Sequence, residues 1–294
     1  MAVESHLPMG LRPHCGFWQT TRFQLSVQNP LVMGIVNVTP DSFSNEAGSL
    51  DTKQTIQHAE RLKRAGADIL DIGGESSRPG AKALTHEQEW QRIAPVIQEL
   101  VRWNVPISVD TYHPQTMQRA LDAGVDIIND IWALRQPGAL QLVATYECGL
   151  CLMHMHGEPF SMQLAPMAGD PLIQVDEFFK QQLRIAEEHH IALNRLVLDP
   201  GIGFGKTVEQ NFALLQRQQE LLSLQLPLLV GWSRKSSLGA VTGLTVADRL
   251  LPSIAAALLA VERGASVVRV HDVAETVSAL AVWRAANGTD IKLG

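Results

Sequence analysis

Cysteine is scarce in this sequence, with three residues in a chain of 294. An odd number of so few cysteines argues against a framework of disulfides. Cys148 and Cys151 do form a C-x-x-C pair, and His154 and His156 follow closely, so a zinc or redox site is conceivable. Yet GLCLMHMH reads as a strand, whose successive side chains face opposite ways, and no second C-x-x-C completes a tetrahedral site. We therefore expect a small buried thiol where a strand starts.

Long apolar runs and an excess of basic charge are also missing. No run reaches the roughly 20 residues that a membrane-spanning helix needs, and LPSIAAALLAV (251–261) reads as a packed helix. The segment MAVESHLPMG has no basic region followed by an apolar one, so no secretory signal is evident. A net charge of −6 gives no overall basic face for nucleic acid, although local patches stay open. The sequence thus predicts a cytoplasmic protein that binds neither membrane nor nucleic acid.

Apolar residues are plentiful at 46%, and charged residues make up only 18%, which supplies a core and argues against disorder. One unit recurs along the chain: a short apolar run, a polar residue, a loop rich in glycine, proline or serine, and a pattern of period near 3.6. The strand candidates are residues 31–37, 67–73, 106–110, 125–130, 149–155, 195–199, 227–231 and 266–271. The helix candidates are 52–65, 86–103, 114–123, 137–147, 171–192, 207–222, 246–263 and 273–286.

The helix ends carry their own signals. Thr85 and Gln88 make a capping box, Pro114 occupies a first helical position, and glycine ends the helices in RAGAD, DAGVD and ERGAS. Eight nearly all-apolar strands, each followed by a helix, predict a closed (β/α)8 barrel, with an open doubly wound sheet as the alternative. We expect one such domain over residues 31–294. Residues 1–30 form an extension, in which GFWQTTRFQLSV is a candidate hairpin closing the barrel bottom.

The stretch LDPGIGFGKT (198–207) invites a phosphate-loop reading, which its spacing opposes. Only three residues separate Gly201 from Gly205, and Pro200, which stands where the loop needs its first glycine, has no N–H to donate. The dinucleotide-binding fingerprint is G-x-G-x-x-G, whereas Gly201, Gly203 and Gly205 are spaced G-x-G-x-G, so that pattern fails too. What remains is a strand that ends in Asp199 and a glycine-rich turn.

In a barrel of this kind the active site lies at the carboxyl ends of the strands. Polar or ionisable residues end nearly every strand candidate, among them Asn37, Asp71, Asp110, Asn129, Asp130, His154, Asp199, Ser233, Lys235, Arg269 and His271. Each alone fits an ordinary turn or helix cap, but so many at one mouth favour a site. Asp110, Asn129 and Asp199 supply acceptors that suit a flat heterocycle rich in N–H donors. An anion, most naturally a phosphate, suits Arg78, Arg269, His271 and Ser233. Asn37 could join a Mg²⁺ that holds the phosphates.

Eight segments, in order, resemble the dihydropteroate synthase family: MGIVNVTPDSFS, GADILDIGGESSRPGA, ISVDT, IIND, LMHM, LDPGIGFGK, SRKSSLG and VVRVHDV. The resemblance runs from about Met33 to Val273. It implies a (β/α)8 barrel, usually a homodimer, that is a transferase of folate biosynthesis. Such enzymes join 6-hydroxymethyl-7,8-dihydropterin diphosphate to 4-aminobenzoate with Mg²⁺, release diphosphate, and are inhibited by sulfonamides. The implied mechanism is dissociative, with diphosphate leaving before the arylamine attacks.

The resemblance also implies residue roles. Pterin contacts fall to Asp110, Asn129, Met153, Asp199 and Lys235. The diphosphate falls to Asn37, Arg78, Arg269 and His271, with Asn37 also on the metal. The 4-aminobenzoate falls to Phe43, Ser77, Pro79, Phe204 and Ser233, together with Lys235. The catalytic set is Asn37, Arg78, Lys235, Arg269 and His271.

The chain departs from the family pattern in the first loop, where Asn45 stands in place of a common Asp and Glu46 is a candidate substitute. Ser77 replaces a usual Thr, and Trp232 replaces a small residue. Two rival functions stay open. One is a methyltransferase domain that passes a methyl group from methyltetrahydrofolate to a corrinoid protein, which has no need of the diphosphate cations. The other is a non-catalytic pterin-binding paralogue, for which Asn45 is the hint.

Overall fold

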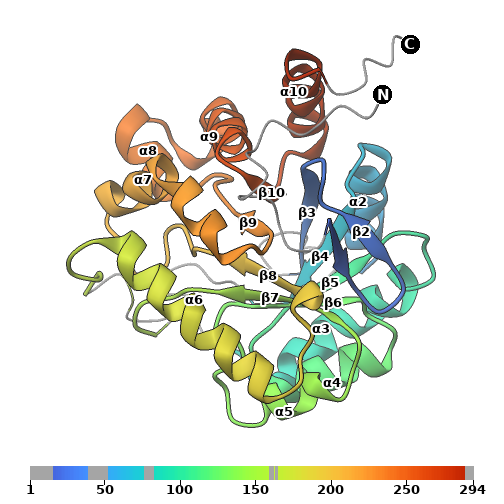
Figure 1. The fold of residues 1–294 in the computed structure, drawn as a ribbon. Coiled ribbons are helices and arrows are strands. Elements are labelled where there is room, and N and C mark those ends of the chain that lie inside the picture. The colour runs from blue at the N-terminus through green and yellow to red at the C-terminus, as the bar shows by residue number, and fades with distance from the viewer. Residues whose placement is uncertain (1–15, 39–51, 76–82, 159–161, 163–164, 289–294) are drawn as a thin grey trace.

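Eight parallel strands form a closed barrel in the computed structural model, which describes residues 16–38, 52–75, 83–158, 162 and 165–288 (Figure 1). The strands are β3 (Leu31–Asn37), β4 (Ile69–Gly73), β5 (Ile107–Asp110), β6 (Ile127–Asp130), β7 (Gly149–Met153), β8 (Leu196–Asp199), β9 (Leu228–Val230) and β10 (Ala265–Val270). Pairing of β10 with β3, with Arg269 opposite Met33, closes the barrel. The predicted (β/α)8 barrel is confirmed, and the open sheet is wrong.

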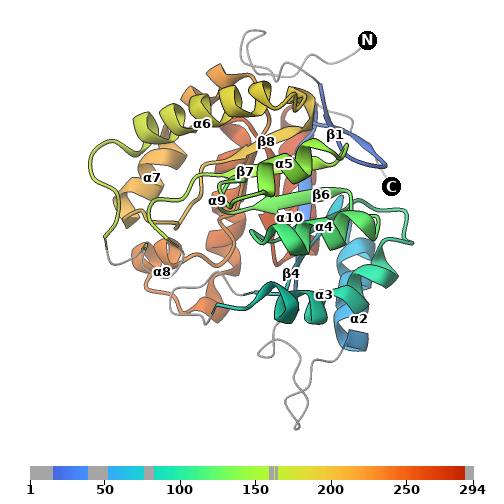
Figure 2. The ribbon, with the colours of Figure 1, turned by 90° about the horizontal axis from the view of Figure 1, so that it is seen from below.

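Helices surround the barrel on its outside (Figures 1 and 2). They are α2 (Thr52–Arg64), α3 (His86–Leu100), α4 (Pro114–Asp122), α5 (Ala139–Ala144), α6 (Pro171–Glu188), α7 (Val208–Gln216), α8 (Ser236–Thr242), α9 (Leu250–Glu262) and α10 (Val273–Ala286). Short 3₁₀ turns are η2 (Leu193–Arg195), η3 (Gln218–Leu224) and η4 (Val246–Asp248). No helix in the described part of the chain combines the length and apolar character needed to cross a membrane.

The helix signals of the sequence mark real ends. Thr85 and Gln88 form the capping box of α3, Pro114 opens α4, and Gly66, Gly124 and Gly264 have positive φ where α2, α4 and α9 end. These glycines adopt a left-handed conformation that most side chains disfavour.

Seven of the eight predicted helices have bounds that differ from those observed, and one helix, α8, was not predicted. The candidates 52–65, 86–103, 114–123 and 137–147 are longer than α2, α3, α4 and α5 by one to five residues. The candidate 207–222 is α7 followed by η3, the candidate 171–192 ends at Glu188, and the candidate 246–263 is η4 followed by α9. His190 explains one of these ends, because its left-handed φ of 57° turns the chain out of α6. Helix α8 is short, so its sequence SSLGAVT offers little periodicity to detect.

The main core lies between the outward faces of the strands and the helices, where Leu70 and Ile72 of β4 pack with Ile93 of α3 and Met117 of α4. All four side chains are fully buried. Parallel strands covered on both faces read as continuous apolar runs, which is why the sequence revealed them clearly.

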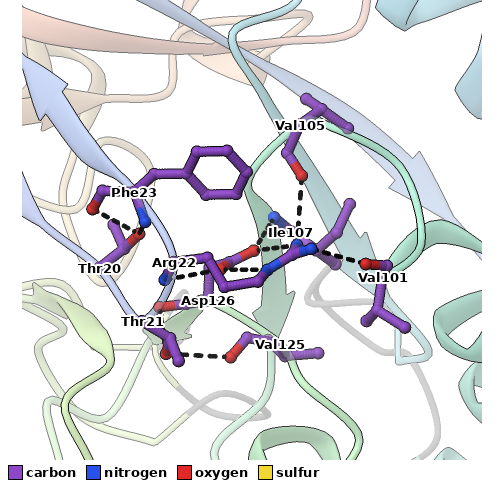
Figure 3. A network of polar contacts seen from close by, with 9 residues as sticks. All are labelled: Thr20, Thr21, Arg22, Phe23, Val101, Val105, Ile107, Val125 and Asp126. Carbon is purple, nitrogen blue, oxygen red and sulfur yellow. Dashed lines mark hydrogen bonds and ion pairs between the residues drawn. The ribbon is translucent and has the colours of Figure 1, made fainter.

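An antiparallel hairpin of β1 (Phe17–Gln19) and β2 (Gln24–Ser26) precedes the barrel. Its Trp18 is fully buried, packs with apolar side chains inside the barrel, and donates from Nε1 to Arg195 O at 2.8 Å. Strand β1 lies beside β8 (Figure 2). Arg22 pairs with Asp126 at 2.6 Å, and Asp126 also accepts from the N–H of Ile107 at 2.9 Å (Figure 3). Ile107 begins β5, so the hairpin lies at the amino end of the barrel, opposite the mouth.

Inside the barrel, side chains of alternate strands fill layers. The layer nearest the hairpin is apolar and consists of Ile69, Ile127, Val197 and Val267 from β4, β6, β8 and β10. Cys151 packs in the same interior cluster, and Cys148 is also a buried free thiol. Burial raises the pKa of both thiols, that of Cys148 to about 11. The prediction of a small buried thiol at the start of β7 is confirmed by Cys148 and Cys151.

Candidate active site

Two residues further along the same four strands, the barrel interior becomes charged. Since side chains alternate along a strand, the next inward positions are Asp71, Asn129, Asp199 and Arg269. Branched apolar residues dominate such layers in other barrels. We call this set the charged layer. Asp71 is fully buried, Asn129 is 4% exposed and Asp199 is 7% exposed, so the layer forms the floor of the barrel mouth.

Arg269 is the centre of the charged layer. Its Nε donates to Asp71 Oδ2 at 2.6 Å, and its Nη2 donates to Asp110 Oδ2 at 2.7 Å. Burial alone would lower the pKa of Arg269, but Asp71 and Asp110 raise it above its ordinary value. The guanidinium therefore stays charged and is fixed between two carboxylates. The structure thus brings Arg269 and Asp110 together, which the sequence had assigned to different parts of one substrate.

Asp110 lies at the end of β5, with its side chain 18% exposed. Burial raises its pKa to about 7; Arg269 opposes this shift, and the neighbouring Asp71 adds to it. A carboxyl group with a pKa near neutrality changes its charge over the pH range in which enzymes work.

Asp199 ends β8 and is held by the turn that follows it. Its Oδ1 accepts from the N–H of Gly201 at 2.7 Å. Burial raises the pKa of Asp199, while the Gly201 N–H, Lys235, Lys206 and Arg269 all act to lower it. One carboxylate oxygen is thus tied to the backbone, and the other is left for a ligand.

The glycines of LDPGIGFGKT build a tight left-handed turn. Gly201, Gly203 and Gly205 have φ of 68°, 81° and 67°. A Cβ on Gly201 would collide with the carbonyl oxygen of His154, and one on Gly205 would collide with that of His156. The turn therefore lies directly against the loop that follows β7.

Lys206 braces this turn from inside, with an exposure of only 3%. Its Nζ donates to Gly201 O at 2.9 Å and Phe204 O at 3.1 Å, and contacts His154 Nδ1 at 2.9 Å. Burial and the Lys206 charge keep the pKa of His154 far below its ordinary value, so Nδ1 is free to accept. Burial likewise lowers the pKa of Lys206 to about 7. Lys206 is a structural brace, and the rejection of a phosphate loop agrees with that position.

The turn yields a direct prediction. Gly201→Ala should lower the free energy of unfolding by about 2–4 kcal/mol, because the added methyl group meets backbone and the φ is unfavourable. Gly138→Ala is a matched control, since Gly138 has a φ of 87° with nothing within 4 Å of its Cβ position. It should cost about 1 kcal/mol. Urea unfolding of both variants tests this, and equal losses would refute the close contact.

One wall of the mouth is apolar. Met153, Phe204 and Ile131 pack with Met155 and Met162 in a cluster of their own. Such thioethers fill irregular gaps and make favourable contacts with aromatic rings.

Lys235 completes this wall. Its Nζ lies 4.3 Å from the centre of the Phe204 ring, a cation–π distance. Burial lowers the pKa of Lys235 to about 8, although the Asp199 carboxylate opposes the shift. A flat ring seated here would meet Asp199 and Lys235 on its edge and sulfur and aromatic groups on its face.

Ser233 and His271 meet just after β9 and β10, where the Ser233 Oγ and His271 Nδ1 are 2.9 Å apart. The Ser233 Oγ also accepts from the His271 N–H at 3.2 Å. Arg249 holds the loop that carries Ser233, since its Nη1 donates to Arg234 O at 3.1 Å and its guanidinium fills the space beside Gly239.

Asn37 ends β3 at this same mouth, and its Oδ1 lies beside Gly73 together with Asp110. An amide oxygen next to a carboxylate is a suitable but incomplete donor set for Mg²⁺. That ion usually keeps several waters and takes further ligands from substrate phosphates. The residues present therefore fit a Mg²⁺ that arrives with a diphosphate, with Asn37 as one ligand.

Every predicted site residue that the structure describes lies at the barrel mouth: Asn37, Asp110, Asn129, Met153, Asp199, Phe204, Ser233, Lys235, Arg269 and His271. The predictions for Phe43, Ser77, Arg78 and Pro79 fall outside the described residues, as do Asn45 and Glu46. The sequence did not predict a role for Asp71, Lys206 or Arg249. Alternation along β4 was the signal for Asp71, because it places Asp71 and Gly73 on the inner face.

The fold and the mouth define a (β/α)8 enzyme whose site combines acids, an amide and cations around a flat apolar wall. The chain belongs to the family of pterin binding enzymes, whose sequence model matches residues 33–271. Within that family its curated relatives are dihydropteroate synthases. One, from Neisseria meningitidis serogroup B, is 47% identical and covers 91% of this chain and 96% of its own length.

Solved structures agree. Dihydropteroate synthase from Xanthomonas albilineans with 4-aminobenzoic acid is 46% identical, with a TM-score of 0.86 over 91% of this chain and 96% of that one. The Burkholderia cenocepacia enzyme complexed with 7,8-dihydropteroate is 44% identical, with a TM-score of 0.85 over 93% and 97%. The Yersinia pestis enzyme in a sulfonamide drug complex is 41% identical, with a TM-score of 0.88 over 93% and 100%. The resemblance seen in the sequence is confirmed.

Proposed function

We propose that this chain is a transferase that condenses 6-hydroxymethyl-7,8-dihydropterin diphosphate with 4-aminobenzoate, giving 7,8-dihydropteroate and diphosphate in folate biosynthesis. The observation that carries the proposal is the charged layer, in which acceptors for a pterin edge lie beside a fixed guanidinium. The relatives named above support the same reaction, because one holds 4-aminobenzoic acid and another holds 7,8-dihydropteroate.

Each side chain then has a task. Asp199 and Asn129 accept hydrogen bonds from the pterin edge, and Met153 packs on the ring. Asp110 accepts another ring N–H and, with Asp199, offers negative charge to a ring that becomes cationic. Lys235 lies between the pterin and the 4-aminobenzoate, which Phe204 and Ser233 also contact, together with Phe43, Ser77 and Pro79. Arg269, His271, Arg78 and Asn37 face the diphosphate.

The reaction itself is dissociative. The bond between the pterin CH₂ and the diphosphate oxygen breaks, and its electron pair leaves with the oxygen. Arg269 and His271 stabilise the charge that develops there. The amine nitrogen of 4-aminobenzoate then forms the new C–N bond and loses a proton. Mg²⁺, held with Asn37, would supply further positive charge for the leaving group.

Diphosphate release tests this proposal against the two rivals. Purified protein should release diphosphate from the pterin substrate only when 4-aminobenzoate and Mg²⁺ are both present. A non-catalytic paralogue would bind the pterin, seen as a change in intrinsic fluorescence, and release nothing. A corrinoid methyltransferase domain would bind methyltetrahydrofolate and ignore 4-aminobenzoate. Sulfonamides should compete with 4-aminobenzoate in the same assay.

The raised pKa of Asp110 gives a pH prediction. Pterin N–H donors favour the carboxylate, so binding should expel a proton, and affinity should fall about tenfold per pH unit below pH 7. Asp110→Asn should remove most of this slope, which pterin titrations from pH 5 to 9 would detect.

The effect on stability has the opposite sign. A folded pKa of about 7, above the ordinary 3.8, favours the folded ligand-free protein most at low pH, and this contribution is lost as pH rises through about 7. If the stability of Asp110→Asn changed with pH as much as that of the wild type, another group would be responsible for the titration.

We further propose a cytoplasmic homodimer formed through α8, η4 and α9. Residues 240–248 are all exposed, including Val241, Leu244 and Val246, and Leu251 on α9 is 75% exposed. An apolar stretch of this size suits an interface between copies. The buried free thiols Cys148 and Cys151 suit a reducing compartment, and cell fractionation tests the location.

Leu251→Asp should convert the dimer to a monomer in sedimentation experiments. Ile173→Asp is the matched control, because Ile173 is a 55% exposed apolar residue on α6, remote in sequence from that segment. A monomeric wild type, or equal effects of both changes, would contradict the interface.

A further inference from the structure

One member of the charged layer has no task in the reaction described above. Asp71 occupies the inward-facing middle of β4, and its side chain is fully buried. A buried carboxylate is costly unless its partners compensate for lost hydration. Both of its hydrogen-bond donors are residues assigned to the substrate. Asp71 Oδ2 accepts from Arg269 Nε at 2.6 Å and from Asn129 Nδ2 at 3.2 Å.

The contact with Asn129 sets the direction of an amide. A side-chain amide has a donor end and an acceptor end of nearly the same shape, so its neighbours decide which way it points. An ionised carboxylate only accepts. Asp71 therefore draws Nδ2 of Asn129 toward itself and turns Oδ1 away. A pterin edge that presents N–H donors needs Oδ1, and a reversed amide would meet it with N–H against N–H.

The contact with Arg269 fixes a cation. With Nε on Asp71 and Nη2 on Asp110, two nitrogens of the planar guanidinium are anchored and its plane is determined. Asp71 and Asp110 come from neighbouring strands, so the anchors are as rigid as the barrel. One carboxylate thus orients both an acceptor for the pterin and a cation for the diphosphate.

We propose that Asp71 is a positioning residue, which touches no substrate and acts by turning the Asn129 carbonyl oxygen toward the pterin and holding the Arg269 guanidinium in place. This inference rests on the proposed function, since it concerns the same site.

The first test is the affinity for 6-hydroxymethyl-7,8-dihydropterin, which lacks the diphosphate and so isolates the Asn129 contact. Asp71→Ala should weaken this affinity by about 10- to 100-fold, because it leaves the buried Asn129 Nδ2 without the oxygen that accepts from it. Ser108→Ala is the control. Ser108 pairs with Asp71 in register, faces the same interior, is fully buried, and has no hydrogen-bond partner for its hydroxyl among the described residues. Its replacement should leave the affinity within about twofold.

Exchanging the acid at position 71 with the amide at position 129 distinguishes an effect on the orientation of the amide from a general loss of structure. Asn129→Asp keeps an acceptor for the pterin but sets two carboxylates against each other, so it should lose at least about tenfold in affinity. The double variant Asp71→Asn with Asn129→Asp restores one amide and one acid. The amide at position 71 can then donate to the carboxylate at position 129, and affinity should recover at least tenfold over the weaker single variant.

Near-wild-type affinity in Asn129→Asp would overturn the inference, even if the variants at Asp71 fail to fold. No recovery in the double variant would also overturn it, because recovery is a result that a purely structural role for Asp71 would not give. If the wild type itself does not bind the dihydropterin, the proposed function fails and the role of Asp71 is not the cause.

Discussion

Asp199→Asn should weaken binding of the dihydropterin by about 2–5 kcal/mol, or about 30-fold to several thousand-fold, the cost of breaking a buried, charge-assisted pair. Asparagine has the shape of aspartate, so one oxygen can still accept from the Gly201 N–H and keep the turn intact. The other end of the side chain then carries N–H donors. It would meet the N–H donors of the pterin ring, and both sets would be left buried without acceptors.

Titration of intrinsic fluorescence measures this loss, and Asp130→Asn controls for the removal of a buried acid. Asp130 ends β6, but alternation places it outside the barrel, where it accepts from the N–H groups of Trp132 and Leu134 at 2.7 Å each. Asp130→Asn should lower the melting temperature and leave pterin affinity within about threefold. Tight binding by Asp199→Asn would remove the pterin from the charged layer and with it the basis of the proposed function.

The barrel was predictable because each step was local. A strand buried on both faces is a continuous apolar run, a glycine with left-handed φ ends a helix, and a βα repeat of eight units closes. The same locality placed most of the site. Residues at the carboxyl ends of parallel strands share one mouth whatever their neighbours are, so Asp110, Asn129 and Asp199 could be assigned to it together.

Pairings across the barrel were not predictable, because they depend on its closure and on strand register. Arg269 and Asp71 are 198 residues apart, and they meet only because β10 closes on β3 and the interior side chains stack in layers. Nothing near Arg269 in the sequence reveals that two acids hold it.

The burial of individual side chains was the other property that the sequence did not reveal. Lys206 follows a glycine-rich turn in the way a phosphate-binding lysine would, and the arguments against that reading were the spacing of the glycines and the missing N–H of Pro200. The structure adds three backbone carbonyl oxygens within 3.4 Å of its Nζ. A buried ammonium with these partners has its hydrogen-bonding capacity committed to the fold.

Arg269→Ala should reduce kcat by about 10²- to 10³-fold, the usual loss when one preorganised group facing a developing anion is removed. The same change leaves Asp71 and Asp110 without their shared cation. The pKa of Asp110 should therefore rise further, and pterin affinity at neutral pH should fall for a reason unrelated to the leaving group. Measuring kcat at saturating pterin and at pH 9, where Asp110 is ionised again, separates the two effects.

Two further variants complete the experiment. Arg269→Lys keeps the charge, but a point charge cannot anchor to two carboxylates and still present a flat edge to a diphosphate, so recovery should be partial. Arg234→Ala removes a cation from the rim of the same mouth, where Arg234 pairs with Asp272 at 2.5 Å and is 41% exposed. Its kcat should stay within about threefold of wild type, as is usual for exposed ion pairs. If Arg269→Ala also stayed within that range, the diphosphate would have to leave from another part of the mouth, and the separation of pterin acids from leaving-group cations would be wrong.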